Sequence, residues 1–495
     1  MDERLKQLIA GCDTLPLHRS GAIQAHGALL CLSADGQRIR HASANLASLV
    51  GVPAESVIGM PAGCLPWLPE DMLAALEPEP GARRHLNAIA PHDSAESIDI
   101  ELIRCEDAVL VELQPTPHGG APLALYDRQR QLLQTPSDSA SLLRHHHTLL
   151  ETVQEITGFD RVMLYRFHDD WSGEVIAERA SAGLGSYLGL HFPASDIPAN
   201  ARELYRLNPS RLIPDIRAPA VPLLGGEGEP PDLSRSGLRS VAPVHLQYLD
   251  HMGVAASFSL PIRVGGRLWG LVACHHRQPR HLGQAQRTAC EGLAGSYSLV
   301  LGSYLAGQRL RNLDSAGRRV ERLIESLSSH ADPFDGLQQN AHVLLQIVDA
   351  SACALVIGDE MALIGEGPDS DGIALLDDWF LHHHPEALLA CDHLEALLPG
   401  QTQALMPACG VLAAKGPSER HGPVRLYWFR PAEPYTVVWA GHPNKPAEED
   451  PSATMLSPRR SFEHWVETRN SYSTAWSNEQ RMTAAKFRTA LAQWL

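Results

Sequence analysis

Asp196 lies in the heptapeptide FPASDIP, residues 192–198, the most rigidly specified loop of the sequence. Pro193 and Pro198 each fix a φ angle and remove a backbone donor, which excludes a helix or a central strand over this stretch. A carboxylate on such a pre-shaped loop can accept a charge-assisted hydrogen bond. A structural alternative is also open, because Ser195 and Asp196 could simply cap the helix PANARELYRL that follows.

Cysteine and histidine are the other residue types that could carry chemistry. Nine cysteines stand at 12, 31, 64, 105, 274, 290, 353, 391 and 409, with no CxxC pair, which favours reduced thiols over a disulfide framework or a zinc knuckle. Most are expected to be small buried hydrophobes. Two histidine triplets, 145–147 and 382–384, are interpreted as surface features, because three consecutive residues cannot all face one ion. We therefore expect no metal site.

The composition is that of a soluble globular protein, since 44% of the 495 residues are hydrophobic and 20% are charged. No apolar run reaches the length of a membrane span, and the start MDERLKQLIAGCD does not resemble a secretory signal. We expect a cytoplasmic protein without membrane association. The formal charge of −16 argues against a chain that mainly binds nucleic acid, which requires clustered Lys and Arg.

The elements that must position these residues indicate an α+β fold of roughly three domains, at about 150 residues each. Residues 28–43 predict a β-hairpin around an Asp-Gly turn, and SIDIELIR and AVLVELQP predict further strands. Proline and glycine between 115 and 122 mark a boundary near residue 120. The segment SLLRHHHTLLETVQEITG has helical spacing that ends at Gly158.

The second domain is predicted to begin with the strand RVMLYRF, and to close with two strands in ASFSLPIRVGGRLWGLVACHH around a Gly-Gly turn. LLGGEGEPPDLSRSG is expected to be a surface loop. The proline-free segment between 279 and 333 predicts one helix of roughly 40 residues and about 60 Å that bridges domains, interrupted at most near Gly302 or Gly307. In the third domain SACALVIGD and GVLAAKG predict strands, a long insertion follows, and NEQRMTAAKFRTALAQWL predicts an amphipathic helix.

Four groups of motifs occur along the chain: GCDTLPLHRSGAIQAHGALL, FPASDIP, RSVAPVHLQYLDHMGV with LWGLVACHH, and WAG with PRRSF. In this order they resemble the photosensory core of a bacterial phytochrome that binds biliverdin, over nearly the whole chain. The resemblance implies antiparallel sheets flanked by helices in three domains: PAS over 1–120 with the chromophore-attachment segment, bilin-binding GAF over 121–310, and PHY over 311–495. It also implies a long helical spine, a PHY hairpin called the tongue at about 430–475, and a figure-of-eight knot between the N-terminal segment and the GAF domain.

The resemblance implies that biliverdin IXα is attached to Cys12 by a thioether. A thiolate can add to a vinyl group, and Val244 stands before His245, where plant-type members place their attachment cysteine. The backbone carbonyl of Asp196 is implied to accept pyrrole N–H groups, while its carboxylate pairs with Arg459 of the tongue. The alternatives are an unreactive Cys12 in a disordered tail and a solvated basic turn at PRRSF.

Further pocket residues are implied by the resemblance, with ordinary core packing or backbone hydrogen bonding as the alternative for each. A protonated bilin with two propionates needs acceptors near its nitrogens, cations at its rim, and aromatic walls around the isomerising ring. The chromophore-binding residues implied in addition to Asp196 are Met163, Tyr165, Phe192, Ile197, Pro198, Tyr205, Arg211, Arg239, His245, Tyr248, Ser257, Ser259 and His275.

The implied function is that of a red/far-red photoreceptor that reversibly isomerises the methine bond between rings C and D. Loss of the contact between Asp196 and Arg459 would let the tongue refold, with Ser461 as the alternative partner and with Trp439 and Trp465 exchanging packing faces. No catalytic centre is evident, so we expect that the chain as given is not an enzyme. The expected partners are a second copy of the chain and an output module absent here, such as a histidine kinase, or a response regulator.

Two rival functions stay open. A GAF-type regulatory protein would bind a small molecule without photochemistry, and Cys12 would be idle. A cysteine-dependent enzyme would use Cys12 with His26 or His245, although nothing in the sequence supplies its oxyanion site. The chain also departs from the family pattern at three alanines, Ala25, Ala242 and Ala440, of which the first two are expected to tune attachment or dark reversion without abolishing binding.

Overall fold

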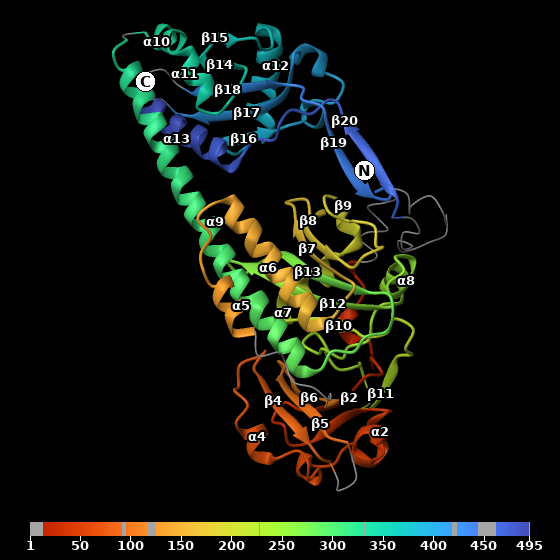
Figure 1. The fold of residues 1–495 in the computed structure, drawn as a ribbon. Helices are drawn as coiled ribbons and strands as arrows, with labels where there is room; N and C mark the ends of the chain where they lie inside the picture. Colours follow the sequence, from red (N-terminus) through yellow and green to blue (C-terminus); the bar gives the residue numbers. More distant parts are fainter. Residues whose placement is uncertain are drawn as a thin grey trace. The chain divides into compact units, whose positions relative to one another are not determined.

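The computed structural model describes residues 13–91, 96–116, 125–226, 228–330, 332–417, 423–443 and 462–494. The chain divides into two compact units (Figure 1). The first contains the chain up to Tyr304 together with Val438–Trp465, and the second contains Leu305–Val437 and Val466–Leu495. Three residues named above, Cys12, Arg459 and Ser461, lie outside the described residues.

A seven-stranded antiparallel sheet occupies one part of the first unit. Its strands, in spatial order, are β1 (Ala22–Ile23), β11 (Val221–Gly225), β3 (Ile39–Ser43), β2 (Ala28–Ser33), β6 (Ala108–Pro115), β5 (Ile98–Arg104) and β4 (Arg83–Ile89). The helices α2 (Leu46–Val50), α3 (Ala54–Val57) and α4 (Glu70–Ala74) follow β3, and α2 and α3 pack against the apolar face of the sheet. The predicted hairpin at 28–43 and the strands in SIDIELIR and AVLVELQP are confirmed.

The N-terminal segment is hydrogen-bonded along both edges by one stretch of the chain. On one edge β1 pairs with β11, with Ala22 opposite Pro222. On the other edge Ser240 donates its N–H to the carbonyl of Ala22 (3.0 Å), and the segment continues to Leu238 through a 2.8 Å bond from the N–H of Gln24. The stretch 221–240 therefore flanks the segment on both sides, which is the arrangement that a figure-of-eight knot requires.

The prediction that LLGGEGEPPDLSRSG is a surface loop is wrong for its first residues. Residues 223–225 belong to β11 and pair antiparallel with β3, with Leu223 opposite Ser43. A strand of five residues is too short to show a clear period of two, and its partners lie far away in the sequence. The strand was therefore not visible in the sequence pattern.

An eight-stranded sheet carries most of the expected site residues. Its order is β10 (Arg211–Ile213), β12 (Ala256–Val264), β13 (Arg267–His276), β7 (Arg161–Phe167), β8 (Gly173–Ala180), β9 (His191–Phe192), β19 (Tyr435–Ala440) and β20 (His464–Arg469). The predicted hairpin of β12 and β13 turns at Gly265 and Gly266, both at positive φ, which glycine adopts without strain. The predicted strand RVMLYRF is β7.

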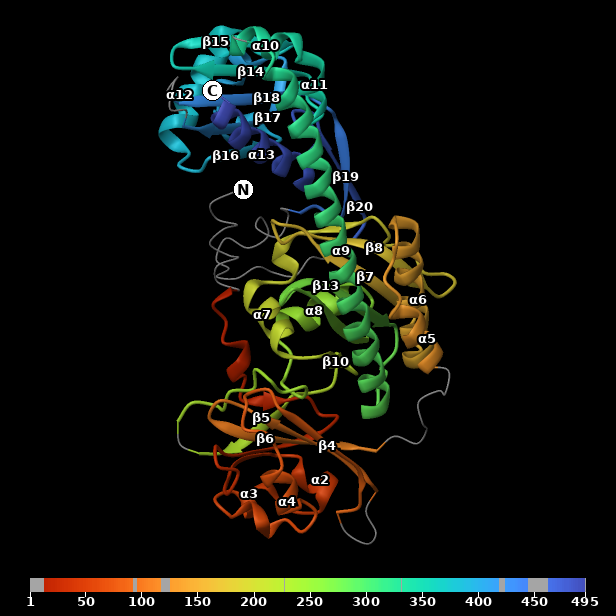
Figure 2. The same cartoon turned by 90° about the vertical axis from the view of Figure 1, so that its left-hand side faces the viewer.

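Three helices lie side by side against this sheet (Figures 1 and 2): α5 (Leu125–Leu132), α6 (Ser139–Thr157) and the first part of α9 (Gln284–Leu327). Asp138 begins α6 with a capping box shared with Ser141, and Gly158 ends it in the left-handed conformation, as the sequence predicts. His146 of α6 is buried against the ring of Tyr297. The interpretation of the first histidine triplet as a surface feature is therefore wrong for His146, because the middle residue of three on a helix can face inward.

The long helix predicted between 279 and 333 is α9, which has 44 residues and a length of about 66 Å. It continues through Gly302 and Gly307 without a break, and its residues belong to both units. Two further helices of the first unit, α7 (Ala199–Leu207) and α8 (Pro243–His251), follow the loops that carry FPASDIP and SVAP.

The second unit is built on a five-stranded antiparallel sheet in the order β15 (Glu360–Gly365), β14 (Ala352–Ile357), β18 (Val424–Pro431), β17 (Ala408–Gly416) and β16 (Leu388–Cys391). Its helices, besides the end of α9, are α10 (Pro333–Gln339), α11 (Ala341–Gln346), α12 (Ser370–His383) and α13 (Asn478–Trp494). The strands predicted from SACALVIGD and GVLAAKG are β14 and β17, and the predicted C-terminal amphipathic helix is α13.

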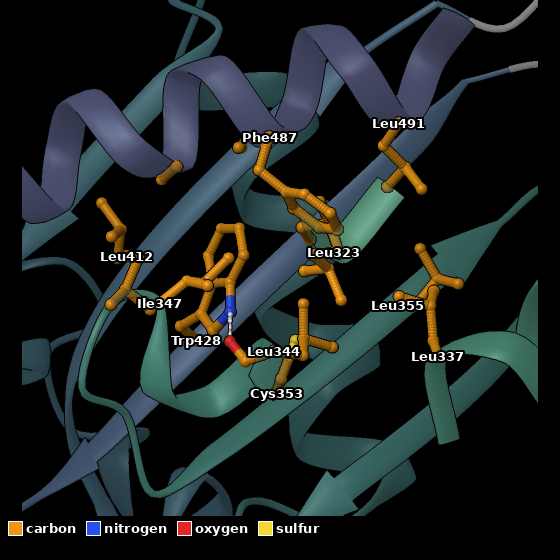
Figure 3. Packing of buried hydrophobic residues seen from close by; sticks show 14 of the residues in the cluster. Leu323, Leu337, Leu344, Ile347, Cys353, Leu355, Leu412, Trp428, Phe487 and Leu491 are labelled. Atoms are coloured by element: carbon orange, nitrogen blue, oxygen red, sulfur yellow. Dashed lines mark hydrogen bonds between the residues drawn. The ribbon is translucent and has the colours of Figure 1, made fainter. Parts of the chain in front are cut away.

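Both faces of this sheet are apolar, because side chains alternate along each strand and helices cover both sides. Trp428 and Leu412 face α9, α11 and α13, while Tyr427 and Val411 face α12. Figure 3 shows Trp428 packed near Phe487, with its indole N–H donating to the carbonyl of Leu344 at 3.2 Å. No helix among the described residues is both long enough and apolar enough to cross a membrane.

Candidate functional site

A cavity of about 250 Å³ lies in the first unit between the eight-stranded sheet and helices α7 and α8. Its walls come from β7, β10, β12, β13, the loop before α7 and the loop before α8. They include every chromophore-binding residue expected from the sequence: Met163, Tyr165, Phe192, Asp196, Ile197, Pro198, Tyr205, Arg211, Arg239, His245, Tyr248, Ser257, Ser259 and His275. The fold therefore brings these residues together around one space.

Strand alternation explains why one sheet face supplies so many of them. The register places Ser257 on β12 opposite His275 on β13, and Tyr165 on β7 opposite Leu271 on β13. Residues two apart point to the same face, so hydroxyl and imidazole groups gather near β10 and β12 while aromatic groups gather near β7 and β9. The cavity thus has a polar end and an aromatic end.

Two arginines at the polar end form no salt bridge with a carboxylate among the described residues. Arg211 donates to the backbone carbonyls of Gly237 (2.9 Å), Arg239 and Ser240. Arg239 donates to two further carbonyls, those of Leu233 and Ser234, each at 3.4 Å. Burial lowers the pKa of Arg211 to about 9, with a further contribution from the charge of Arg239, and burial lowers the pKa of Arg239 to about 10. These shifts indicate that an anion bound in the cavity would relieve the cost of two buried cations.

Two histidines in the same wall are held neutral. Burial, and then the charge of Arg211, lowers the pKa of His245 to about 4. Burial lowers the pKa of His275 to about 3, with smaller contributions from Arg161 and His245. The buried Nδ1 of His275 has no hydrogen-bond partner among the described residues. A neutral imidazole with one unused nitrogen can donate to, or accept from, a polar group in the cavity.

Asp196 lies on a single 3-10 turn, Ala194–Asp196, between the two prolines. The prolines exclude a longer helix over FPASDIP, as predicted, and the turn is closed by the N–H of Asp196, which donates to the carbonyl of Pro193 at 3.0 Å. The Oδ2 atom of Asp196 accepts a hydrogen bond from the hydroxyl of Tyr248 at 3.0 Å. Its carboxylate thus points across the loop toward α8.

The N-cap residue of α7 is Pro198 rather than Ser195 or Asp196, and its side chain makes no capping hydrogen bond. The carboxylate of Asp13 accepts the N–H of Ala199 at 2.6 Å instead. Asn200 adds a second link by donating its side-chain N–H to the carbonyl of Leu15 at 3.1 Å. The residue that follows Cys12 is therefore fixed at the start of α7, beside the cavity.

The aromatic end is closely packed. Tyr165 lies edge-on to Phe167 at 5.2 Å and tilted to Phe192 at 5.9 Å. A Cβ on Gly173 would come within 1.8 Å of the Tyr165 ring, so only glycine leaves room for it. Nearby, the hydroxyls of Tyr205 and Ser259 are 3.0 Å apart. Aromatic rings thus line this end of the cavity, and the hydroxyls of Tyr205 and Ser259 form a hydrogen bond beside them.

The long insertion predicted in the third domain contributes residues to the first unit. Trp439 of β19 pairs in parallel register with His191 of β9, and their rings are 5.8 Å apart. Trp465 packs against His442 at 4.4 Å between ring centres. Arg459 and Ser461 lie outside the described residues. Phe462, the residue after Ser461, meets the ring of Tyr248 edge-on at 5.2 Å.

Some lining residues were missed by the sequence reasoning. Leu15 and Leu17 line the cavity from the N-terminal segment, and Met252 lines it from the end of α8. Apolar residues give no signal of their own, although Leu15 and Leu17 lie within the motif that contains Cys12 and could have been included. Ala242, one of the noted departures, is the N-cap residue of α8 and also lines the cavity. A serine at this position would place a hydroxyl in the wall.

Comparison with protein families divides the chain into three matches. Residues 12–116 match the PAS fold, residues 146–301 match the GAF domain, and residues 317–495 match the phytochrome region. The match to the PAS fold covers most strands of the seven-stranded sheet, and the match to the GAF domain covers most strands of the eight-stranded sheet. The match to the phytochrome region covers the five-stranded sheet of the second unit.

Individual proteins give longer matches. The bacteriophytochrome of Xanthomonas campestris pv. campestris is 32% identical over 94% of this chain and 75% of its own length. Cyanobacterial phytochrome B of Nostoc sp. is also 32% identical, over 98% of this chain, but the chain spans only 66% of that relative. Among solved structures, the photosensory core module of Stigmatella aurantiaca phytochrome is 34% identical and superposes with a TM-score of 0.85, covering 97% of each chain. A bacteriophytochrome from R. palustris gives a TM-score of 0.83 at 33% identity, covering 98% of this chain and 99% of that one.

Proposed function

This chain belongs to the phytochrome family, and on that premise we propose that it senses red and far-red light through biliverdin IXα held in the cavity. When bound, the tetrapyrrole supplies light absorption and Z/E isomerisation of the methine bond between rings C and D. The residues of the chain bind it, orient it and respond to it. The protein is proposed to act in the cytoplasm as a sensor rather than as a catalyst.

The observation that carries the proposal is that Arg211 and Arg239, at the polar end of the cavity, donate to backbone carbonyls and form no salt bridge among the described residues. A linear tetrapyrrole with two propionates offers two carboxylates to these two cations, and arginine binds carboxylates in a bidentate geometry. His245 and His275 are neutral and can hydrogen-bond ring nitrogens or a ring carbonyl. The residues present therefore fit the group.

We place the attachment at Cys12. The position of Asp13 supports this role, because the residue that follows Cys12 in the sequence is fixed at the start of α7 beside the cavity. Addition of the thiolate to a vinyl group forms one C–S bond, and a proton goes to the other vinyl carbon, so that no oxidant is needed. The neutral imidazoles of His245 and His275 would hold the ligand in place.

Asp196 is proposed to act as the switch residue, with Arg459 and Ser461 as its alternative partners. Two contacts support this proposal: Tyr248 donates to Asp196, and the same tyrosine ring meets Phe462. Phe462 follows Arg459 and Ser461 closely in the sequence, and it is the described residue through which this part of the tongue contacts Tyr248. Exchange between the two partners would favour different structures of the tongue, with Trp439 and Trp465 changing their packing.

The partners proposed for the chain are a second copy of itself and a downstream output domain or response regulator. Three exposed apolar side chains on neighbouring helices of the first unit support self-association: Tyr126 of α5, Leu143 of α6 and Leu299 of α9, which are 75%, 48% and 75% exposed. The activity of any output module, such as a histidine kinase, would be regulated through α9 and α13. The domain boundaries proposed for PAS, GAF and PHY are 1–120, 121–310 and 311–495.

Covalent attachment provides a direct test. Purified chain is incubated with biliverdin, denatured and weighed by mass spectrometry, alongside Cys12→Ser and the control Cys64→Ser, which changes an exposed thiol. We expect one added chromophore mass in the wild-type chain and in Cys64→Ser, and none in Cys12→Ser. An adduct that persists in Cys12→Ser would overturn the attachment site. Absence of any bilin absorbance would favour the GAF-type regulatory alternative.

A further inference from the structure

Two histidines and a glutamate meet on the sheet face opposite the cavity. His168 follows β7, Glu174 is on β8 and His191 is on β9, and one ligand atom from each lies within 4.8 Å of the others. The imidazole rings of His168 and His191 stack at 5.4 Å with an interplanar angle of 11°. The Nε2 atom of His168 is 3.5 Å from Oε2 of Glu174. This nitrogen is also buried without a hydrogen-bond partner among the described residues.

The sheet register builds this arrangement. Glu174 is directly opposite His191 on β9 and directly opposite Arg166 on β7. Tyr165 and Phe192 line the cavity, so their neighbours Arg166 and His191 point to the other face. His168 joins them through the turn after β7, where its N–H bonds the carbonyl of Ser172 at 2.8 Å. The cluster is therefore separate from the cavity, although one strand pair carries both.

The donor set matches a known class of ion. Two imidazoles and one carboxylate bind Zn²⁺ and similar divalent transition metals, with a solvent molecule as fourth ligand. Ligand bonds of about 2.0–2.1 Å place neighbouring donors of a tetrahedral site about 3.4 Å apart. His168 and Glu174 already stand at about this separation. The donor atom of His191 lies within 4.8 Å of the other two, so a small movement of the side chains brings three donors to one ion.

We propose that His168, Glu174 and His191 form a binding site for a divalent transition-metal ion such as Zn²⁺. The affinity is limited by Arg166, which donates to Oε2 of Glu174 at 2.8 Å. A metal ion and a guanidinium compete for the same carboxylate. The Arg166 side chain is 41% exposed, so it can turn toward solvent when the ion binds. Removing its charge is therefore expected to tighten binding.

The site also has a structural consequence, which rests on the proposed photoreceptor function. Trp439 pairs with His191 through the backbone, and the two rings are in contact. A metal ion bound to His191 fixes this ring and favours the strand arrangement of β9 and β19. Since tongue refolding would separate these strands, the ion is expected to slow photoconversion while leaving bilin attachment unchanged.

Metal binding can be tested without chromophore or light. The chain is stripped with a chelator and titrated with Co²⁺, whose visible d–d absorbance reports a tetrahedral site with nitrogen ligands. We expect one Co²⁺ per chain that Zn²⁺ displaces, loss of this signal in His168→Ala, and several-fold tighter binding in Arg166→Gln. His382→Ala is the matched control, because His382 is an exposed histidine beside an acidic residue in the second unit.

The outcomes separate the possibilities. Equal Co²⁺ binding by the wild-type chain and His168→Ala, or loss of binding in His382→Ala alone, would overturn the site. Retained biliverdin uptake by His168→Ala shows that this variant is folded. If His168→Ala fails to fold, Arg166→Gln decides, since unchanged Co²⁺ affinity in that variant contradicts the proposal. Failure of the photoreceptor function would leave the Co²⁺ result intact, and would affect only the expected effect on photoconversion.

Discussion

The hydroxyl of Tyr248 donates a 3.0 Å hydrogen bond to Oδ2 of Asp196, and the ring of the same tyrosine meets Phe462 edge-on. One side chain of α8 thereby links the rigid FPASDIP loop to the segment that ends the insertion of the third domain. The loop residue has a fixed position because the turn Ala194–Asp196 is held between two prolines. This pair is the structural basis of the proposed switch.

Asp196→Ala is expected to keep biliverdin bound but to reduce the amplitude of the red/far-red difference spectrum. The carboxylate would be lost, while the backbone carbonyl that is proposed to accept the pyrrole N–H groups would remain. Tyr248→Phe should change the spectrum in the same direction and lower the free energy of unfolding by about 0.5–1.5 kcal/mol, the usual value for one hydrogen bond. Asp250→Ala, on the exposed side of α8, serves as the control. An unchanged difference spectrum in Asp196→Ala would contradict the role of this residue.

Arg211→Met separates ligand binding from stability. The substitution removes a buried cation that has only carbonyl acceptors among the described residues, so the ligand-free chain should change in stability by no more than about 1 kcal/mol. Biliverdin affinity should fall by at least tenfold, since breaking a buried charge pair costs about 2–5 kcal/mol. Fluorescence titration and urea unfolding measure the two effects. Arg217→Met, at an 80% exposed position, is the control, and equal affinity in both variants would argue against a propionate clamp.

The ligand-free chain should lose stability as the pH falls below about 6.5. His245 and His275 have folded-state pKa values of about 4 and about 3, below the value of 6.5 that applies in the unfolded chain. Between these values the unfolded state takes up protons that the folded state does not, so unfolding is favoured by up to about 1.4 kcal/mol per pH unit for each histidine.

Urea unfolding at pH 7, 6 and 5 measures this dependence. His275→Gln should flatten the slope, whereas His147→Gln, at an exposed position of α6, should leave it unchanged. A slope that is the same in His275→Gln and the wild-type chain would show that His275 is protonated in the folded state. The comparison therefore tests the burial of this imidazole directly.

Gly173→Ala is expected to destabilise the chain by about 1–3 kcal/mol and to shift the bilin absorbance. Its Cβ would lie within 1.8 Å of the Tyr165 ring, which would have to move into the cavity or repack. Gly185→Ala is the matched control, because a Cβ at Gly185 meets nothing within 4 Å and its φ is not positive. Thermal unfolding and the absorption spectrum provide the readouts, and equal behaviour of the two variants would mean that the Tyr165 ring is not confined.

Elements with strong local signals were predicted correctly from the sequence. The hairpin of β12 and β13 was visible because Gly265 and Gly266 interrupt two apolar runs, and α6 was visible because Gly158 ends a helical period. β11 was not visible, since its five residues find their partners in β1 and β3, far away in the chain. His146 was misassigned because a triplet on a helix has one inward face that only packing reveals.

The site shows the same division between local and distant information. Asp196 could be singled out from its two prolines alone, and the motifs supplied the remaining pocket residues. The capping alternative for Asp196 fails because Asp13, 183 residues earlier in the chain, takes that position. The cluster of His168, Glu174 and His191 was missed because its members are unremarkable in sequence and only the pairing of β7, β8 and β9 assembles them. When metal ligands come from separate strands, no fixed spacing along the sequence reveals them.

The most direct test of the central claim is an absorption spectrum of the purified chain with biliverdin, recorded in darkness and after alternating red and far-red illumination. We predict two long-wavelength bands that interconvert reversibly, with the dark spectrum recovered after illumination ends. A single bilin band that light does not change would contradict the photoswitch, although it would still support binding of biliverdin in the cavity.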